Sequence, residues 1–496
     1  MVKVALITPE LHALVRRTNL AGVAQELARG LQLVGADVRV FLPRTREVSL
    51  EGLRDVEQAA NVRVQVAGDR LDFRVLAARL GELPIYLFEQ KQLFENRFPY
   101  GDENGPYPDN WRRYGMFARA VLESMEPLGF AVDVLHCLDW TSGLVPLFHR
   151  LDHLNGETAG TGDHPLARAG SFFSFNNLAM QGAFEREVLA RLGIPHEYFK
   201  NTGGVELGGK VNFLKAGAEF GTVLCTHSPS HAEVIQNQDR GYGLEDVFQR
   251  RKKELLGIHN GVDYHAWDPA RDPLLAANFS AKDADLSGKR KCKQALQNDL
   301  GLDVSAKTVL ACHVGRWDAD SGFDLLSEVM GALLEHNLEL VVMGAGSEEV
   351  QKRLRTVEAT FPGRLKVLFG YDASAAHRLL AGADVLLMPS HYQPANSLFA
   401  VALRYGAAPF IYAQSGLEDA VLDVLDKPKE GLGFHFAPYT GEGLLDGLNR
   451  VIELHKDQDA WRELVQRLLA QDFSWERAAN EYLKAYRRVT RRIRGR

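Results

Sequence analysis

At 496 residues, the chain is too long for one ordinary hydrophobic core, and its length favours two or three domains. Its composition, with 46% hydrophobic and 25% charged residues, is typical of a globular protein rather than a disordered or fibrous one. The formal net charge of -6 gives no general reason to expect a nucleic acid or an anionic membrane as a partner.

The N-terminus enters a strand-like run at once, so we expect no signal peptide. No apolar run approaches about 18 residues, so we expect no transmembrane helix. The four cysteines, Cys137, Cys225, Cys292 and Cys312, lie far apart without metal-ligand spacing. We therefore expect buried thiols in the reducing cytoplasm, no metal site and no cofactor.

The first half of the chain alternates strand-like and helical runs. After "VKVALITPE" comes the periodic segment "LAGVAQELARGLQLVG", and then the strand-like runs "DVRVFLPR", "DVLHCLD", "GSFFSFNN" and "GTVLCTHS". Alternation of this kind indicates a parallel sheet covered by helices.

The same rhythm restarts near residue 307 with "TVLACHVGRW", "LELVVMGAG", "LKVLFGYD", "DVLLMPS" and "APFIYA". We predict an α/β protein with two doubly wound, Rossmann-like domains, at 1–250 and 251–470, followed by a C-terminal helical segment at 471–496. In such folds, ligands bind outside the carboxyl ends of the strands, so we expect a site in a cleft between the domains.

Three parts of the sequence contain residues suited to ligand binding, and each also has a simpler structural explanation. "GAGSEE" at 344–349 follows a strand as a phosphate-binding turn does, but it lacks the third glycine, and a simple tight turn is equally compatible. Arg316 ends another strand and either reaches a phosphate or forms a surface ion pair. The aromatic-rich segment 86–117 suits stacking on sugars, although packing beneath loops is the more common role of such clusters.

"MPSHYQPANSLFAVALRYG" at 388–406 reads as the end of a buried strand, a turn through Pro389 and Pro394, and a helix from about Ser397. A turn at this place in an open α/β sheet binds ligands, and the helix start attracts anions. Here the turn offers Gln393, Ala395 and Asn396, with no acid, lysine or glycine.

Taken in order, long segments of the chain resemble the bacterial glycogen synthases and plant starch synthases of glycosyltransferase family 5. They include "YPDNWRRYGMFARAVLE", "NNLAMQGAFEREVLARLGIP", "GYGLEDVFQRRKKELLGIHNGVDYHAWDP" and "YDASAAHRLLAGADVLLMPS". The resemblance implies the GT-B architecture, in which a C-terminal helix returns to the first domain. It also implies retaining transfer of glucose from ADP-glucose to the non-reducing end of an α-1,4-glucan.

The family's chemical positions are substituted in the first domain. The Lys-Thr-Gly-Gly-Leu loop of the family corresponds to Arg16-Arg17-Thr18-Asn19-Leu20, which has lost both glycines. The family's His-Asp-Trp appears as Leu138-Asp139-Trp140, and its His-Asn-Leu appears as Asn176-Asn177-Leu178. Leucine can neither donate nor accept a hydrogen bond.

In the second domain the family aims an arginine and a lysine at the leaving diphosphate. Arg316 is present, but Ser321 stands at the lysine position. The family's Glu-Pro-Cys-Gly-Leu appears as Gln393-Pro394-Ala395-Asn396-Ser397. Loss of one preorganised charge of this kind typically costs about 10² to 10³ in rate.

The resemblance implies catalytic positions at Asp139, Arg316 and Gln393, and donor contacts from Arg16, Arg17, Asn177, Arg316, Gly344, Gly346, Tyr371, Ala395, Asn396 and Ser397. Because five segments depart at these positions, we expect the transfer activity to be lost or greatly reduced. A glucan-binding or regulatory role would remain, with α-glucan, a nucleotide sugar or a partner glycogen synthase as binding partners. The alternative is an active retaining transferase with the standard or an altered donor and acceptor.

Overall fold

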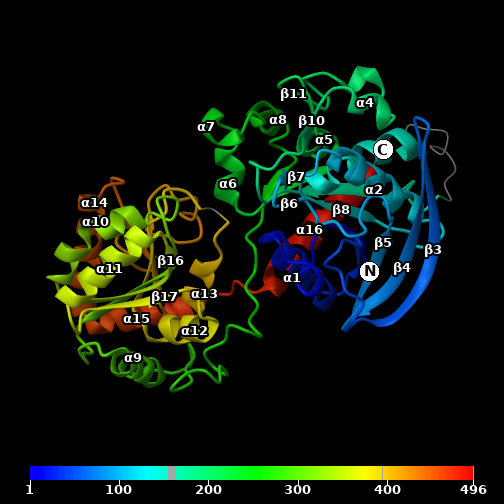
Figure 1. Ribbon diagram of the computed structural model, residues 1–496. Coiled ribbons are helices and arrows are strands. Elements are labelled where there is room, and N and C mark those ends of the chain that lie inside the picture. The colour runs from blue at the N-terminus through cyan, green and yellow to red at the C-terminus, as the bar shows by residue number, and fades with distance from the viewer. Residues whose placement is uncertain (155–163, 394, 495–496) are drawn as a thin grey trace. The chain divides into compact units, whose positions relative to one another are not determined.

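The chain folds into two compact units, each built on its own parallel sheet (Figure 1). The computed structural model describes residues 1–154, 164–393 and 395–494. Unit 1 comprises Met1–Asn260 together with Trp475–Arg496, and unit 2 comprises Gly261–Ser474. Pro394, one of the two prolines expected in the turn at 388–406, lies outside the described residues.

The unit 1 sheet has nine strands, of which the first seven in spatial order are parallel. A long antiparallel hairpin extends it at one edge. The spatial order is β14 (Leu255–Gly257), β13 (Val223–Thr226), β9 (Gly170–Ser174), β8 (Val134–Leu138), β1 (Lys3–Ile7), β2 (Asp37–Pro43), β5 (Leu83–Glu89), β4 (Asp69–Leu80) and β3 (Arg54–Val66).

Helices and short strands complete unit 1. The helices are α1 (Leu20–Leu33), α2 (Asn110–Ser124), α3 (Val145–Phe148), α4 (Val188–Arg191), α5 (Phe213–Phe220), α6 (Pro229–Val234), α7 (Gln238–Gly241), α8 (Glu245–Arg250) and α16 (Trp475–Arg494). The short strands are β6 (Gly101–Asp102) with β7 (Gly105–Pro106), and β10 (Ala183–Phe184) and β11 (Glu206–Leu207) on either side of β12 (Lys210–Asn212).

The C-terminal helix α16 packs on α1 within unit 1, where Figure 1 draws the first and last helices of the chain side by side. The approach is close because Gly30 faces α16: a Cβ atom there would lie 2.8 Å from the Trp475 carbonyl oxygen. The buried His136 ring in β8 lies 2.6 Å from the Tyr486 hydroxyl and 2.7 Å from the Ser174 hydroxyl. These contacts fix α16 to the sheet.

The unit 2 sheet is entirely parallel, in the spatial order β17 (Leu365–Phe369), β16 (Leu338–Gly346), β15 (Val309–Trp317), β18 (Val385–Met388), β19 (Ala408–Tyr412) and β20 (Phe434–Phe436). Its helices are α9 (Ser287–Leu300), α10 (Phe323–Leu334), α11 (Glu348–Thr360), α12 (Ala373–Gly382), α13 (Leu398–Arg404), α14 (Gly441–Lys456) and α15 (Gln458–Leu469). The central strands are buried almost continuously, as strands covered on both faces are.

The strand order of unit 2, counted along the chain, is 3-2-1-4-5-6, the order of a dinucleotide-binding fold. Its topological switch point lies between β15 and β18. In unit 1 the chain likewise places β2 on one side of β1 and β8 on the other, so β1 and β8 flank a second switch point. The predicted pair of doubly wound units is confirmed.

The aromatic-rich segment 86–117 contributes mainly to the core of unit 1. Phe88, Phe94, Tyr114 and Phe117 are fully buried and meet edge to face. Packing therefore explains these four rings.

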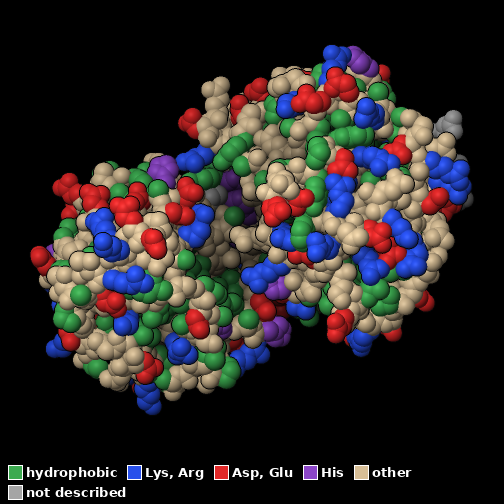
Figure 2. Space-filling model, viewed as in Figure 1, with side chains coloured by type: hydrophobic (Ala, Val, Ile, Leu, Met, Phe, Trp, Pro, Cys, Tyr) green, Lys and Arg blue, Asp and Glu red, His purple; other side chains and the backbone are tan. Residues whose placement is uncertain are grey.

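All four cysteines are buried free thiols, as predicted. None of the described helices is both long enough and apolar enough to cross a membrane. Acidic and basic side chains intermingle over the β3–β4 hairpin in Figure 2, and Arg63 pairs there with Asp72. That face of the hairpin therefore has no patch of a single charge sign.

Candidate functional site

The loop after β1 is organised around one buried carboxylate, Glu10. The backbone N–H groups of Arg17 and Thr18 donate to Glu10 Oε2, at 2.6 and 2.9 Å. The hydroxyls of Thr18 and Tyr100 donate to Oε1, at 2.8 and 2.5 Å. Two amides of the loop that aligns with the family's glycine-rich segment are therefore occupied by the chain's own carboxylate.

The arginine side chains of this loop point elsewhere. Arg17 Nε donates to Glu47 at 2.8 Å, and its guanidinium lies 4.2 Å from the centre of the Phe98 ring. Arg16 is exposed. Of the two expected donor contacts here, Arg17 is thus ion-paired, while Arg16 remains at the surface.

Asp139 directly follows β8, on the other side of the unit 1 switch point. Its backbone has φ 56° and ψ -175°, a strained conformation for a residue with a side chain. The Asn176 N–H donates to Asp139 Oδ1 at 2.8 Å. Burial raises the pKa of the Asp139 carboxyl to about 7, and the nearby Glu10 adds to this effect, while the Asn176 and Asn177 N–H groups oppose it.

The neighbours of Asp139 offer little to a ligand. The Leu138 side chain is buried in the apolar core, and the Asn177 side chain closes its own turn by accepting from the Ala179 N–H at 2.9 Å. Position 138, at which the family carries a histidine, is therefore purely apolar here.

Arg316 lies near the end of β15, at the switch point of unit 2, and is held between two carboxylates. Its Nε lies 3.2 Å from Asp318 Oδ2, and its Nη2 lies 3.7 Å from Asp320 Oδ2. Two negative charges thus surround one positive charge, so these three groups together carry a net charge of about -1. The ion-pair alternative for Arg316 is the one observed.

Ser321, at the family's lysine position, points into the protein rather than toward a ligand. It is buried, and its hydroxyl lies 2.6 Å from the Arg316 carbonyl oxygen and 2.8 Å from that of Asp318. The next residue, Gly322, has φ 71°, and a Cβ atom there would lie 2.1 Å from the Pro389 carbonyl oxygen. The loops after β15 and β18 therefore touch, and Ser321 closes the first of them.

The turn between β18 and α13 is held by its own carboxamides. Asn396 Nδ2 donates to Gln393 Oε1 at 2.9 Å, while Asn396 Oδ1 accepts from the Leu398 N–H at 3.0 Å. The Gln393 N–H donates to the Ser415 carbonyl at 2.9 Å. Asn396 thus occupies the first amide of α13, where an anion would otherwise be attracted.

The remaining predicted donor contacts lie along the same edge of the unit 2 sheet. Gly344 and Gly346 are inside β16 rather than in a turn, and they allow close pairing with β15: a Cβ atom on Gly344 would lie 1.7 Å from the Gly315 carbonyl oxygen. Ser347 caps α11 by accepting from the Val350 N–H. The expected turn at 344–349 is therefore a strand end followed by a capped helix.

Tyr371 and Ala395 are exposed, and Ser397 is the residue preceding α13. The loops after β15 and β18 touch at the unit 2 switch point, so the predicted site residues of both loops lie at the same edge of the sheet. These residues are Arg316, Ser321, Gln393, Ala395, Asn396 and Ser397.

Sequence reasoning missed three groups at these positions. Asp318 and Asp320 were visible in "GRWDADSG" as acids on both sides of an expected phosphate contact. His313 in β15 donates from Nδ1 to the Leu387 carbonyl at 3.0 Å, and its ring also lies beside the Arg316 backbone. Burial lowers the pKa of His313, while contacts with the Leu387 and Arg316 backbones oppose this effect. Its place three residues before Arg316, on the same strand, was the available signal.

Among the residues that the structure describes, no group of three or more histidine, cysteine, aspartate or glutamate side chains is arranged to hold a metal ion.

The chain is similar to known proteins over nearly its whole length. A family model described as the starch synthase catalytic domain matches residues 3–250, and one described as glycosyl transferases group 1 matches residues 300–467. A glycogen synthase of Geotalea uraniireducens (strain Rf4) is 36% identical, with 98% of each chain covered. A glycogen synthase of Anaeromyxobacter sp. (strain Fw109-5) is 37% identical, covering 98% of this chain and 99% of the relative.

Among solved structures, the catalytic domain of Starch Synthase IV from Arabidopsis thaliana, bound to ADP and acarbose, is similar over 99% of both chains. The sequence identity is 27% and the TM-score is 0.80. This similarity confirms the predicted GT-B fold class.

Proposed function

This chain belongs to the glycogen synthase and starch synthase family, glycosyltransferase family 5, and from that premise we propose that it binds α-glucan while transferring glucose from ADP-glucose poorly or not at all. The starch synthase to which it is similar holds ADP and acarbose, a sugar-like ligand. We carry over glucan binding from that relationship, and we argue the loss of transfer from this chain's own residues.

The charge around Arg316 is the observation that carries the proposal. Retaining glucosyl transfer releases a nucleoside diphosphate, so the site must stabilise negative charge as it develops on the leaving group. Here the single arginine at that position is paired with Asp318 and Asp320. These two carboxylates repel a diphosphate that approaches Arg316, whereas a preorganised pair of cations would attract it.

Two further contacts support the same conclusion. Ser321 supplies no cation, and its hydroxyl is committed to the carbonyl groups of its own loop. Asn396 occupies the Leu398 amide at the start of α13 and also restrains Gln393. Loss of a single preorganised charge or donor lowers rates by about 10² to 10³, and several losses in one site combine without being additive.

A second candidate function, an active transferase with a changed donor or acceptor, is favoured by two observations. Arg16 is exposed at the first position of the loop that corresponds to the family's Lys-Thr-Gly-Gly-Leu, and the His313 ring lies beside the Arg316 backbone. If this candidate is correct, ADP or UDP will be released from the matching nucleotide-glucose in the presence of glycogen, and Arg316→Ala will abolish that release.

Restoration of the family's residues tests the preferred proposal. We expect the wild-type chain to co-sediment with glycogen, and we expect the triple variant Leu138→His, Ser321→Lys, Gln393→Glu to gain measurable ADP release from ADP-glucose. Adding Asp320→Asn should raise that release further, because it removes one carboxylate from Arg316. A wild-type chain that fails to co-sediment with glycogen would rule out glucan binding.

A partner glycogen synthase on the same glucan remains part of the proposal. If it exists, a catalytically competent relative will be recruited to glycogen at a lower concentration when this chain is present.

A further inference from the structure

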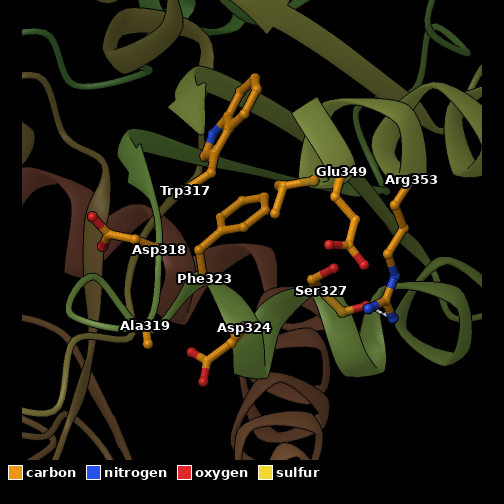
Figure 3. A pocket seen from close by; sticks show the side chains of 9 residues that line it. Trp317, Asp318, Ala319, Phe323, Asp324, Ser327, Glu349 and Arg353 are labelled. Carbon is orange, nitrogen blue, oxygen red and sulfur yellow. Dashed lines mark hydrogen bonds between the residues drawn. The ribbon is translucent and has the colours of Figure 1, made fainter. Parts of the chain in front are cut away.

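A small cavity of about 240 Å³ in unit 2 lies beside the β15–α10 loop, between that loop, α10 and α11 (Figure 3). Its apolar floor comes from Trp317, Phe323 and Val350. The two aromatic rings are stacked, with centroids 5.7 Å apart and planes inclined by 29°, and both are almost fully buried. The two buried, stacked rings therefore support the apolar side of the cavity.

Polar groups line the rim. Asp324 stands in the first turn of α10, with Ser327 one turn further along, and Glu349 and Arg353 extend from α11 (Figure 3). Arg353 Nη2 donates to the Ser327 carbonyl at 2.9 Å, which holds the guanidinium at the rim while its other N–H groups can bind a ligand. The rim thus offers both donors and acceptors.

The charge balance disfavours an anion, because three carboxylates and one guanidinium line the cavity. Asp318, which also lines the cavity, is already paired with Arg316. Glu349 and Arg353 are four residues apart on α11, a spacing at which opposite charges compensate. A phosphate would face three carboxylates and one guanidinium, whereas a neutral ligand rich in hydroxyl groups would meet acceptors, donors and an apolar floor together.

The volume of the cavity further limits which class of ligand can bind. Pockets for drug-sized molecules measure about 300–1,000 Å³, so this cavity is too small for a nucleotide sugar but large enough for one sugar ring. We infer that the cavity between α10 and α11 is a separate glucan contact that takes one glucosyl unit of an α-glucan chain. This inference rests on the proposed glucan binding and names a place on unit 2 where it occurs.

Protection of an introduced thiol tests the site directly. Because the four native cysteines are buried, Ser327→Cys creates one reactive thiol facing the cavity. We expect maltoheptaose to slow its alkylation by iodoacetamide by about tenfold at ten times the dissociation constant, by mass action. Lys352→Cys, exposed on α11 and outside the cavity, is the matched control and should be unprotected. Sorbitol at equal concentration should protect neither thiol.

A second variant tests whether the Arg353 guanidinium takes part in binding. Arg353→Ala should weaken maltoheptaose protection of the Ser327→Cys thiol by about tenfold, the usual effect of losing a charged hydrogen-bond donor. Equal alkylation rates with and without maltoheptaose, in a chain that still co-sediments with glycogen, would overturn the inference and leave the proposed function standing. Failure to co-sediment as well would overturn both.

Discussion

At the scale of single residues, Asp318 and Asp320 make the charge of the β15–α10 loop negative. Each lies within ion-pair distance of Arg316, the cation to which the family resemblance assigns the diphosphate. Asp318 also accepts from the Ser321 N–H at 3.0 Å, so it shapes the loop as well as the charge. Asp320 has no such second role among the contacts of the described residues, and it is therefore the cleaner position to change.

Replacing Asp320 by asparagine should strengthen ADP binding by up to about fivefold, because exposed ion pairs are worth about 0.2–1 kcal/mol. Isothermal titration of ADP at low ionic strength measures the change, since salt screens exposed charges. Glu328→Gln, at an exposed position of the neighbouring helix α10, is the control that should leave the affinity unchanged. Equal affinities of wild type and Asp320→Asn would show that the carboxylate does not restrain Arg316.

Asp139 should make the stability of unit 1 depend on pH. The pKa of its carboxyl is raised from 3.8 to about 7 by burial, so the native state holds the proton more tightly than the unfolded state does. This stabilisation is fully present below about pH 4 and is lost as the pH rises through 7.

Relative to Asp139→Asn, which cannot titrate, the wild type should therefore lose stability between pH 5 and 7.5, by at most about 1.4 kcal/mol per pH unit. Thermal unfolding of both proteins across this range measures the difference. A difference between the two proteins that does not change with pH would mean that the Asp139 carboxyl titrates normally.

The substituted residues show why the site was only partly predictable from sequence. The loss of charge at Ser321 and Gln393 can be read from residue types alone. The pairing of Asn396 with Gln393, the inward direction of the Ser321 hydroxyl and the use of loop amides by Glu10 cannot, because each depends on where a loop folds back on itself. Hydrogen bonds between loops have no periodic signal in the sequence.

At the scale of elements, close helix packing gives a matched pair of glycine tests in α1. Gly30→Ala should destabilise unit 1 by about 1–3 kcal/mol, because the new methyl group would lie 2.8 Å from the Trp475 carbonyl oxygen. Gly22→Ala, on the same helix with nothing within 4 Å, should stabilise it by about 0.5–1 kcal/mol. Denaturant titration measures both, and equal shifts would show that α16 does not pack tightly at Gly30.

The turn before α13 allows a similar test. Asn396→Ala removes the acceptor for the Leu398 N–H and should lower the stability of unit 2 by about 0.5–1.5 kcal/mol, the usual net contribution of one hydrogen bond. Asn396→Asp keeps that acceptor and loses only the donor to Gln393, so it should retain most of the stability. Thermal unfolding distinguishes the two variants, and equal losses would place the stabilising contribution in the Gln393 contact instead.

The elements themselves were easier to predict than the site. Buried runs such as those of β15 and β18 are continuous apolar segments, and the helices between them have a 3.6-residue period, so both are local properties of the chain. The sequence predicts the strand-like run 338–346 but also allows a turn from Gly344, and β16 continues through Gly346. This continuation depends on pairing with β15, a contact between distant segments.

At the scale of the whole molecule, family membership and residue chemistry lead to different expectations. Similarity over nearly the full length supports the fold and the class of substrate. The charges and hydrogen bonds at the unit 2 switch point support our proposal that the family's reaction is slow in this chain. A glucan-binding protein of this fold satisfies both observations.

The rate of ADP release from ADP-glucose, with glycogen as acceptor, tests this conclusion most directly. Under the same conditions a glycogen synthase relative from Geotalea uraniireducens serves as the reference. We expect the rate for this chain to be at least about 10³-fold lower, because more than one leaving-group contact is missing. A rate within about tenfold of the reference, less than the loss of a single such contact, would contradict the proposed loss of transfer.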